Sequence, residues 1–224
     1  MNSMGDDAVL PMGLAYLAGI LEEGSHQVSI VDSPGEALGQ YAPLEGTVNG
    51  LRHGLPDDKI ISRISDTVQI IGLSIMFSME WLPSRNLINL IREKFPNAII
   101  VVGGEHITAL PEYCMQDCAA IDYCVLGEGE QTLLELVEAV DASLNVHDVE
   151  GLCLRHNDEI IRTKPRARLR NVDKLPRPAW DLLPVSNYLD NGVMSGIDFG
   201  RSMPILASRG CPFSCTFCSN PTMW

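Results

Sequence analysis

Three apolar runs of strand length, each followed by a segment with helical periodicity, most constrain how this 224-residue chain can fold. The runs span residues 68–76, 98–102 and 121–126, and the helical segments lie near 87–91, 107–115 and 133–137. Strands that alternate with helices in this way form βαβ crossovers, which build a parallel sheet with helices on both faces. Continuous apolar runs are typical of strands covered on both faces. We therefore predict an α/β domain with a parallel sheet.

Less regular segments precede this alternating core. Residues 12–21 carry apolar side chains at helical spacing and predict a helix, and residues 28–32 predict a short strand. Residues 34–56 are rich in Gly and Pro and predict a long loop, after which Pro56 and Asp57 begin a short helix. We therefore expect this part of the chain to hold fewer regular elements than the core.

After the core, the chain is predicted to form a hairpin, a linker and a further strand. Residues 151–162 predict a β-hairpin that turns at His156-Asn157-Asp158. Residues 171–192 contain three prolines and Trp180, which is typical of an ordered linker between domains. Residues 203–208 predict a new strand that leads directly into a group of cysteines.

Glycine-rich or polar loops follow each of the three core strands directly. Ligands of open α/β sheets bind in the crevice at the carboxyl ends of the strands. The three loops therefore predict a small-molecule site at that edge of the sheet. Its candidate cofactor-binding residues are Ser74, Met76, Ser78, Gly103, Gly104, Glu105, His106, Gly127, Glu128 and Gly129.

Two of these loops have alternative interpretations. Gly127–Glu130 begins like the G-x-G-x-x-G fingerprint of dinucleotide sites, but Thr132 replaces the third glycine and the downstream acidic residue is missing. The motif then either presents helix N–H groups to a ligand or only starts a helix. Gly103 and Gly104 either allow a ligand to approach the backbone closely or form a plain turn at the end of the strand.

The composition excludes several classes of protein. A net charge of −13 argues against a nucleic-acid partner, because phosphate binding depends on clustered Lys and Arg. The one basic run, Arg162 to Arg170, predicts a solvated linker, or alternatively a contact with another domain or an anionic substrate. No stretch is apolar enough to span a membrane and no secretory signal is visible, so we expect a cytoplasmic protein.

Seven cysteines fall into two groups. Cys211, Cys215 and Cys218 have the spacing C-x3-C-x2-C, and three thiolates so close in sequence converge only if the chain loops tightly around a shared centre. Zinc normally takes a fourth ligand, whereas an iron–sulfur cluster held by three thiolates keeps one iron open. The remaining four are predicted to be small apolar core residues: Cys114, Cys118, Cys124 and Cys153.

The segment Ser208–Cys218 resembles the signature of radical S-adenosylmethionine (SAM) enzymes, including the aromatic residue before the last cysteine. Upstream segments are similar in order and spacing to the cobalamin (B12)-binding subgroup of that superfamily: Pro11–Gly19, Ile71–Ser74, Gly103–His106, Gly127–Glu130 and the linker Leu175–Pro184. Together these segments cover nearly the whole chain.

The resemblance implies that Cys211, Cys215 and Cys218 each ligate one iron of a [4Fe–4S] cluster, and that the fourth iron binds SAM. An external one-electron reductant of the flavodoxin or ferredoxin type then drives cleavage of SAM to a radical that attacks a small-molecule substrate. The resemblance also implies bound cobalamin and a methyltransferase, or a related radical cyclase or rearrangement enzyme. The competing hypothesis is a non-catalytic, flavodoxin-like module that binds a ligand and holds a structural metal.

The resemblance further implies a domain organisation. We expect a B12-binding, flavodoxin- or Rossmann-like domain over residues 1–145 that lacks its first strand, and a hairpin and linker over 146–200. Residues 201–224 would be the first strand and cluster loop of a truncated radical SAM (β/α) barrel, so we expect this fragment alone to be inactive. The D-x-H-x-x-G motif of other cobalamin proteins is missing, and His106 is expected to line the crevice rather than ligate cobalt.

Overall fold

The computed structural model describes residues 8–44, 48, 50–157, 159–191, 200–213 and 215–218. The chain divides into two compact units. The first combines residues 1–65 with 176–207, and the second combines 66–175 with 208–224. Parts of several predicted features lie outside the described residues: positions 45–47 and 49 of the loop, Asp158 of the hairpin turn, position 192 of the linker and Ser214 of the cysteine motif, together with the whole stretch 219–224.

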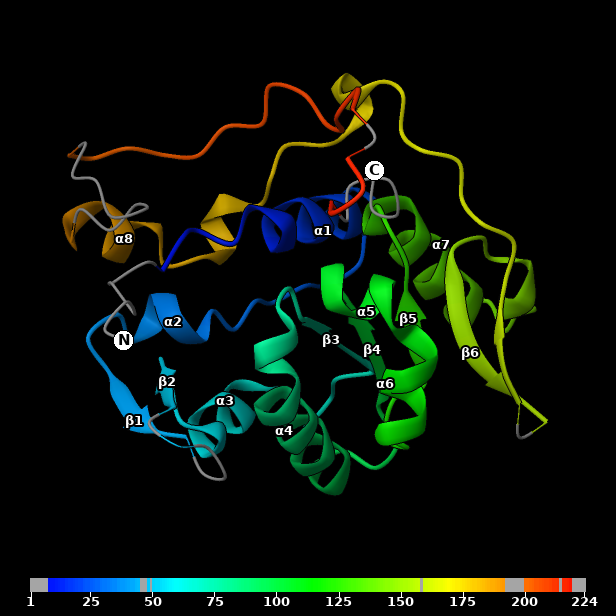
Figure 1. The fold of residues 1–224 in the computed structure, drawn as a ribbon, viewed down its shortest axis with the longest axis horizontal. Helices are drawn as coiled ribbons and strands as arrows, with labels where there is room; N and C mark the ends of the chain where they lie inside the picture. The colour runs from blue at the N-terminus through cyan, green and yellow to red at the C-terminus, as the bar shows by residue number, and fades with distance from the viewer. Residues whose placement is uncertain are drawn as a thin grey trace. The chain divides into compact units, whose positions relative to one another are not determined.

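The second unit is built on a five-stranded sheet with the strand order β3-β4-β5-β6-β7 (Figure 1). The first three strands are parallel and the last two are antiparallel to their neighbours. Their bounds are Ile70–Ser74 (β3), Ile99–Gly103 (β4), Tyr123–Val125 (β5), Leu152–His156 (β6) and Glu159–Arg162 (β7). The predicted parallel strands are confirmed, and the predicted hairpin extends the same sheet.

Helices connect the parallel strands as predicted, with two differences. The helix expected over 107–115 is wrong as one element, because Pro111 has no N–H to continue it and instead begins a second helix. The helix after β3 begins earlier than predicted, at Trp81. The bounds are Ser78–Glu80 (η1), Trp81–Lys94 (α4), Glu105–Ala109 (α5), Pro111–Asp117 (α6), Gly129–Asp141 (α7), Val146–Asp148 (η2) and Val172–Lys174 (η3).

Helices pack on both faces of the sheet. On one face, Leu136 of α7 joins Val101 and Val125 in a buried apolar cluster. On the other, Met115 of α6 lies with its Sδ 3.8 Å from the Sγ of Cys153 on β6. β3 is an edge strand and does not follow the prediction of coverage on both faces, because Gly72 and Ser74 are exposed.

The first unit contains short elements around one buried cluster. Its bounds are Met12–Glu23 (α1), Ser33–Glu36 (α2), Tyr41–Pro43 (β1), Leu51–His53 (β2), Asp57–Arg63 (α3), Trp180–Leu182 (η4) and Val185–Asn191 (α8). α1 and α3 confirm two predicted helices. The long loop expected over 34–56 is wrong, since α2 and the antiparallel pair β1–β2 lie within it. None of the helices in the described ranges is long and apolar enough to cross a membrane.

Two predicted strands do not form. Residues 28–32 and 203–208 adopt no strand conformation, although their sequences favour one. A strand is stabilised by ladder hydrogen bonds to a neighbour. Neither segment pairs with any strand in the described part of the chain. β-propensity alone therefore does not order these residues into a sheet.

Asp32 is the buried polar centre of the first unit. It is 5% exposed, and one carboxylate oxygen accepts a 2.7 Å hydrogen bond from the hydroxyl of Tyr188. Its other oxygen accepts from the N–H of Gly35 at 3.1 Å. Burial raises the pKa of Asp32, and the bond from Tyr188 opposes that rise. The pair joins α8 to the start of α2, residues far apart in sequence.

All seven cysteines lie within the described residues and carry free thiols. Burial raises the pKa of Cys114 to about 12 and that of Cys153 to about 11. Cys118 and Cys124 are also buried, which confirms the prediction that these four cysteines belong to the core. The three cysteines of the C-x3-C-x2-C motif are exposed.

Replacing Tyr188 with Phe removes the donor to a buried carboxylate and should lower the free energy of unfolding by about 1–3 kcal/mol. The loss should be fully present at pH values where Asp32 is ionised and should fade as the pH falls through its raised pKa. Urea unfolding at several pH values measures both effects. Tyr113→Phe, at an exposed tyrosine, is the matched control, and an equal loss in both variants contradicts the prediction.

Alkylation should separate the two groups of cysteines. The thiolate is the reactive form, so buried thiols with raised pKa values should not react in the folded chain. Iodoacetamide at pH 8 (about half a unit below the pKa of a free thiol) should therefore modify only Cys211, Cys215 and Cys218 until urea is added. Mass spectrometry of the peptides measures this. Modification of Cys114 or Cys153 at a similar rate before unfolding is the contrary result.

Candidate functional site

The three predicted ligand loops lie side by side at the carboxyl ends of β3, β4 and β5. The N–H of Ile75 donates to the carbonyl of Gly103 at 2.8 Å, which joins the loops after β3 and β4. The N–H of Gly127 donates to Oγ1 of Thr108 at 3.0 Å, which joins the loop after β5 to α5. The structure thus brings together the predicted elements of the crevice.

Gly104 is required by the protein itself. Its φ of +106° lies in a region that favours glycine. A Cβ at this position would overlap the backbone carbonyl of Ile75. The glycine was expected to let a ligand approach the backbone closely. In the structure, the backbone of the β3 loop at Ile75 makes that close approach.

His106 lies beneath the loops. It is 5% exposed, its Nδ1 lies 2.9 Å from Oγ of Ser78, and its Nε2 lies 3.5 Å from Sγ of Cys114. Burial lowers its pKa, which favours a neutral ring. Its ring also stacks at a tilt on Trp81, with centroids 5.5 Å apart. Both ring nitrogens have protein partners, so the geometry favours His106 as a support for the β3 loop.

Apolar side chains are exposed directly after β3. Met76, Phe77 and Met79 are 44%, 61% and 75% exposed. Apolar groups gathered on a surface commonly mark a binding site. Met76 was predicted as a site residue from its place in the loop, whereas Phe77 and Met79 were not. The continuation of apolar residues past the end of the strand was the sequence signal for them.

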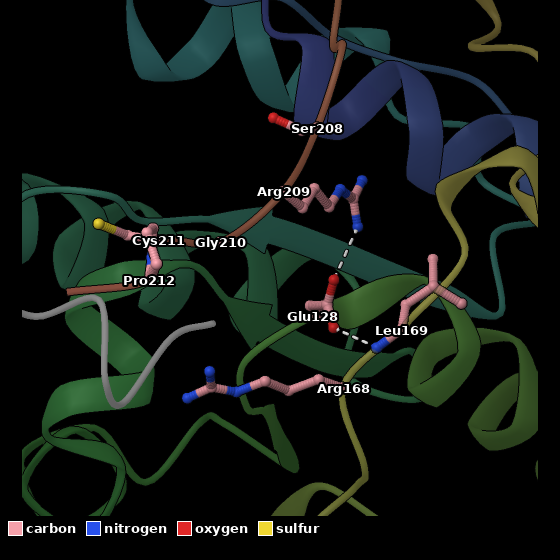
Figure 2. Close-up of a pocket in the computed structure, with 8 residues that line it drawn as sticks. All are labelled: Glu128, Arg168, Leu169, Ser208, Arg209, Gly210, Cys211 and Pro212. Carbon is pink, nitrogen blue, oxygen red and sulfur yellow. Dashed lines mark hydrogen bonds and ion pairs between the residues drawn. The ribbon is translucent and has the colours of Figure 1, made fainter. Parts of the chain in front are cut away.

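The loop after β5 holds ion pairs that the sequence did not predict. Nη1 of Arg209 lies 3.4 Å from Oε1 of Glu128, and its Nη2 pairs with Glu130 in the first turn of α7. The other carboxylate oxygen of Glu128 accepts the N–H of Leu169 at 2.7 Å. Figure 2 shows Arg209 and Leu169 directed at the same carboxylate. Glu128, a predicted cofactor-binding residue, thus has partners within the protein.

An open pocket of about 410 Å³ lies beside these ion pairs (Figure 2). Cys211, the first cysteine of the motif, contributes to its wall. The complete lining is Glu128, Arg168, Leu169, Ser208, Arg209, Gly210, Cys211 and Pro212. The structure therefore brings one motif cysteine to the loop that follows β5.

The three motif cysteines lie on one exposed, irregular segment. The N–H of Cys218 donates to the carbonyl of Cys215 at 3.1 Å, across a turn at Thr216 and Phe217. No three His, Cys, Asp or Glu side chains gather as a metal site among the described residues. Thiolates converge fully only when a metal binds, because binding and ordering are coupled. Three accessible thiols on a short loop are a donor set that fits an iron–sulfur cluster.

Four of the five basic residues in the run 162–170 are exposed, as expected of a solvated segment, but the run also forms ion pairs with the protein. Arg162 pairs with Glu112 at 2.5 Å, and Lys164 pairs with Glu150 at 2.6 Å. Arg166, which is 16% exposed, pairs with a glutamate on α7. Alternate residues of this segment therefore pair with acidic partners within the second unit, one of them on α7.

Comparison with known proteins places the chain in a family. The model of the B12 binding domain matches residues 6–137. The chain is 33% identical, over 94% of its length, to an uncharacterized methyltransferase of Pyrococcus horikoshii, and spans 40% of that protein. It is 29% identical, over 96% of its length, to an anaerobic magnesium-protoporphyrin IX monomethyl ester cyclase of Cereibacter sphaeroides, and spans 32% of it.

The fold has a counterpart among solved structures. The cobalamin-dependent S-adenosylmethionine radical enzyme OxsB, solved with aqua-cobalamin and S-adenosylmethionine bound, superposes with a TM-score of 0.72 at 22% identity. The match covers 95% of this chain and 26% of OxsB. The chain thus spans two fifths or less of these proteins. It belongs to the B12-binding domain family, and the proteins it is similar to include a cobalamin-dependent radical SAM methyltransferase of Streptomyces tokunonensis, 30% identical over 58% of this chain.

Proposed function

We propose that this chain carries the cobalamin-binding and cluster-binding parts of a cobalamin-dependent radical SAM enzyme. One observation carries the proposal. Cys211 of the C-x3-C-x2-C motif lines the same pocket as Glu128, which follows the third parallel strand. The edge of the sheet where α/β proteins bind ligands and the segment suited to an iron–sulfur cluster therefore lie next to each other.

Cys211, Cys215 and Cys218 would hold a [4Fe–4S] cluster through their thiolates. All three are exposed, so they are accessible for assembly. When bound, the cluster supplies an electron to SAM at its open iron. Burial raises the pKa of the other four cysteines, so their thiols stay protonated and do not compete for iron.

Cobalamin would lie over the loops that follow β3, β4 and β5. The exposed Met76 and Phe77 offer apolar surface there, and Ser74 offers a hydroxyl at the strand end. Both ring nitrogens of His106 already have partners, Ser78 and Cys114. We therefore propose that His106 supports the loop without ligating cobalt. Cobalamin supplies the carrier chemistry, and the protein positions it.

The whole protein would act on a small molecule, by methyl transfer or by a related radical cyclisation or rearrangement. The relatives include a methyltransferase and a cyclase, which supports both forms. An external one-electron reductant would serve the cluster. We propose a cytoplasmic setting, since seven free thiols suit a reducing compartment. A net charge of −13 favours a small-molecule substrate over a nucleic acid.

Anaerobic reconstitution tests the cluster. The full chain should take up about four irons and four sulfides, and Cys→Ala at any one motif position should abolish stable incorporation. Cys118→Ala, at a buried cysteine, should keep the wild-type iron content and is the matched control. Stoichiometric zinc without sulfide would instead support the competing binding module with a structural metal.

Titration with hydroxocobalamin tests the cobalamin site. Ser74→Phe places a bulky ring at the carboxyl end of β3 and should weaken binding at least about tenfold, or about 1.4 kcal/mol. Gln69→Phe places the same ring on an exposed residue at the amino end of the same strand and should leave binding unchanged. Absorbance or calorimetry measures both. Equal effects of the two variants would place the site elsewhere.

A further inference from the structure

We infer that Arg209 is a positioning residue whose ion pairs with Glu128 and Glu130 hold the segment leading into Cys211 against the amino end of α7. The inference deepens the proposed function and rests on it, because the segment held in place is the proposed cluster loop. The two glutamates of the motif Gly127–Glu130 then hold that loop through their ion pairs with Arg209.

Burial is the first argument. The side chains of Arg209, Glu128 and Glu130 are only 8%, 12% and 9% exposed. Burying a charged side chain costs a large free energy of desolvation unless the charge is paired and hydrogen-bonded. The pairing therefore has to be kept for the segment to stay docked. Arg201, which precedes Arg209 by eight residues, is 65% exposed, so the two arginines differ strongly in burial.

Geometry is the second argument. The guanidinium of Arg209 uses one terminal nitrogen for Glu128 and the other for Glu130. A lysine ammonium is a single point charge on a flexible stem and does not reproduce this planar fork. Both carboxylates lie at the start of α7, where the helix dipole favours negative charge. The acidic partners are thus stabilised by the helix itself.

Chain connectivity is the third argument. Arg209 precedes Cys211 by two residues, which span at most about 7 Å of extended chain. Docking Arg209 therefore confines the first cysteine to the neighbourhood of the loop after β5. Glu128 also accepts the N–H of Leu169 at 2.7 Å, so one carboxylate holds two segments that arrive from distant parts of the sequence.

Limited trypsin digestion of the cofactor-free chain tests the docking. Trypsin must take the arginine side chain into its own pocket. Cleavage after Arg209 should therefore be slow in the wild-type chain, while cleavage after the exposed Arg201 is fast. Glu128→Gln and Glu130→Gln should each speed the cut after Arg209 at least about tenfold, or about 1.4 kcal/mol.

Glu135→Gln is the matched control, because Glu135 pairs with Arg166 elsewhere on α7. It should leave cleavage after Arg209 unchanged. Cleavage after Arg92 in α4 reports general unfolding. Equal rates after Arg209 and Arg201 in the wild type would overturn the inference. So would acceleration that also reaches Arg92, since the glutamates would then support the whole unit.

A second measurement uses the reconstituted chain. Arg209→Ala keeps all three cysteines but should change the electron paramagnetic resonance spectrum of the reduced cluster and speed loss of iron to a chelator. Arg209→Lys should restore part of both, and Arg201→Ala should match the wild type. Wild-type behaviour of Arg209→Ala would refute a positioning role. If the wild-type chain binds no cluster, the proposed function fails, while the digestion still reports whether Arg209 is docked.

Discussion

Parallel pairing of β3, β4 and β5 is the constraint on which the candidate site depends. In register, Ser74 lies beside Gly103, and Val102 lies beside Cys124, so three strand ends meet at one edge. A helical crossover carries the chain from that edge back to the amino edge, so that the next strand again ends at the carboxyl edge. Loops that are distant in sequence thereby become neighbours. The hydrogen bonds between them then set only the local positions of their residues.

The sequence predicted the core of the fold because burial leaves a periodic trace. Apolar runs and helical spacing located β3, β4, β5 and the crossovers between them. It did not predict pairings that leave no such trace. Residues 28–32 have strand-like composition but pair with no strand among the described residues, and Pro111 breaks a helix that the apolar spacing alone predicted as continuous. The pair Arg209–Glu128 joins residues 81 positions apart, which no local pattern reveals.

Several residues predicted to meet a ligand also have partners within the protein. Gly104 makes room for the backbone of Ile75, His106 holds Ser78, and Glu128 holds Leu169 and Arg209. The candidate residues that remain exposed at the strand ends include Ser74 and Met76.

The antiparallel pair β6–β7 has a topological consequence. β6 runs back from the carboxyl edge of the sheet, and β7 reverses direction again, with the carbonyl of Lys164 accepting the N–H of Gly151. Because β6 and β7 run in opposite directions, the chain leaves β7 at the same carboxyl edge from which it entered β6, and no helix is needed between them. The hairpin therefore returns the chain to the carboxyl edge of the sheet, where the N–H of Leu169 donates to Glu128 at the amino end of α7.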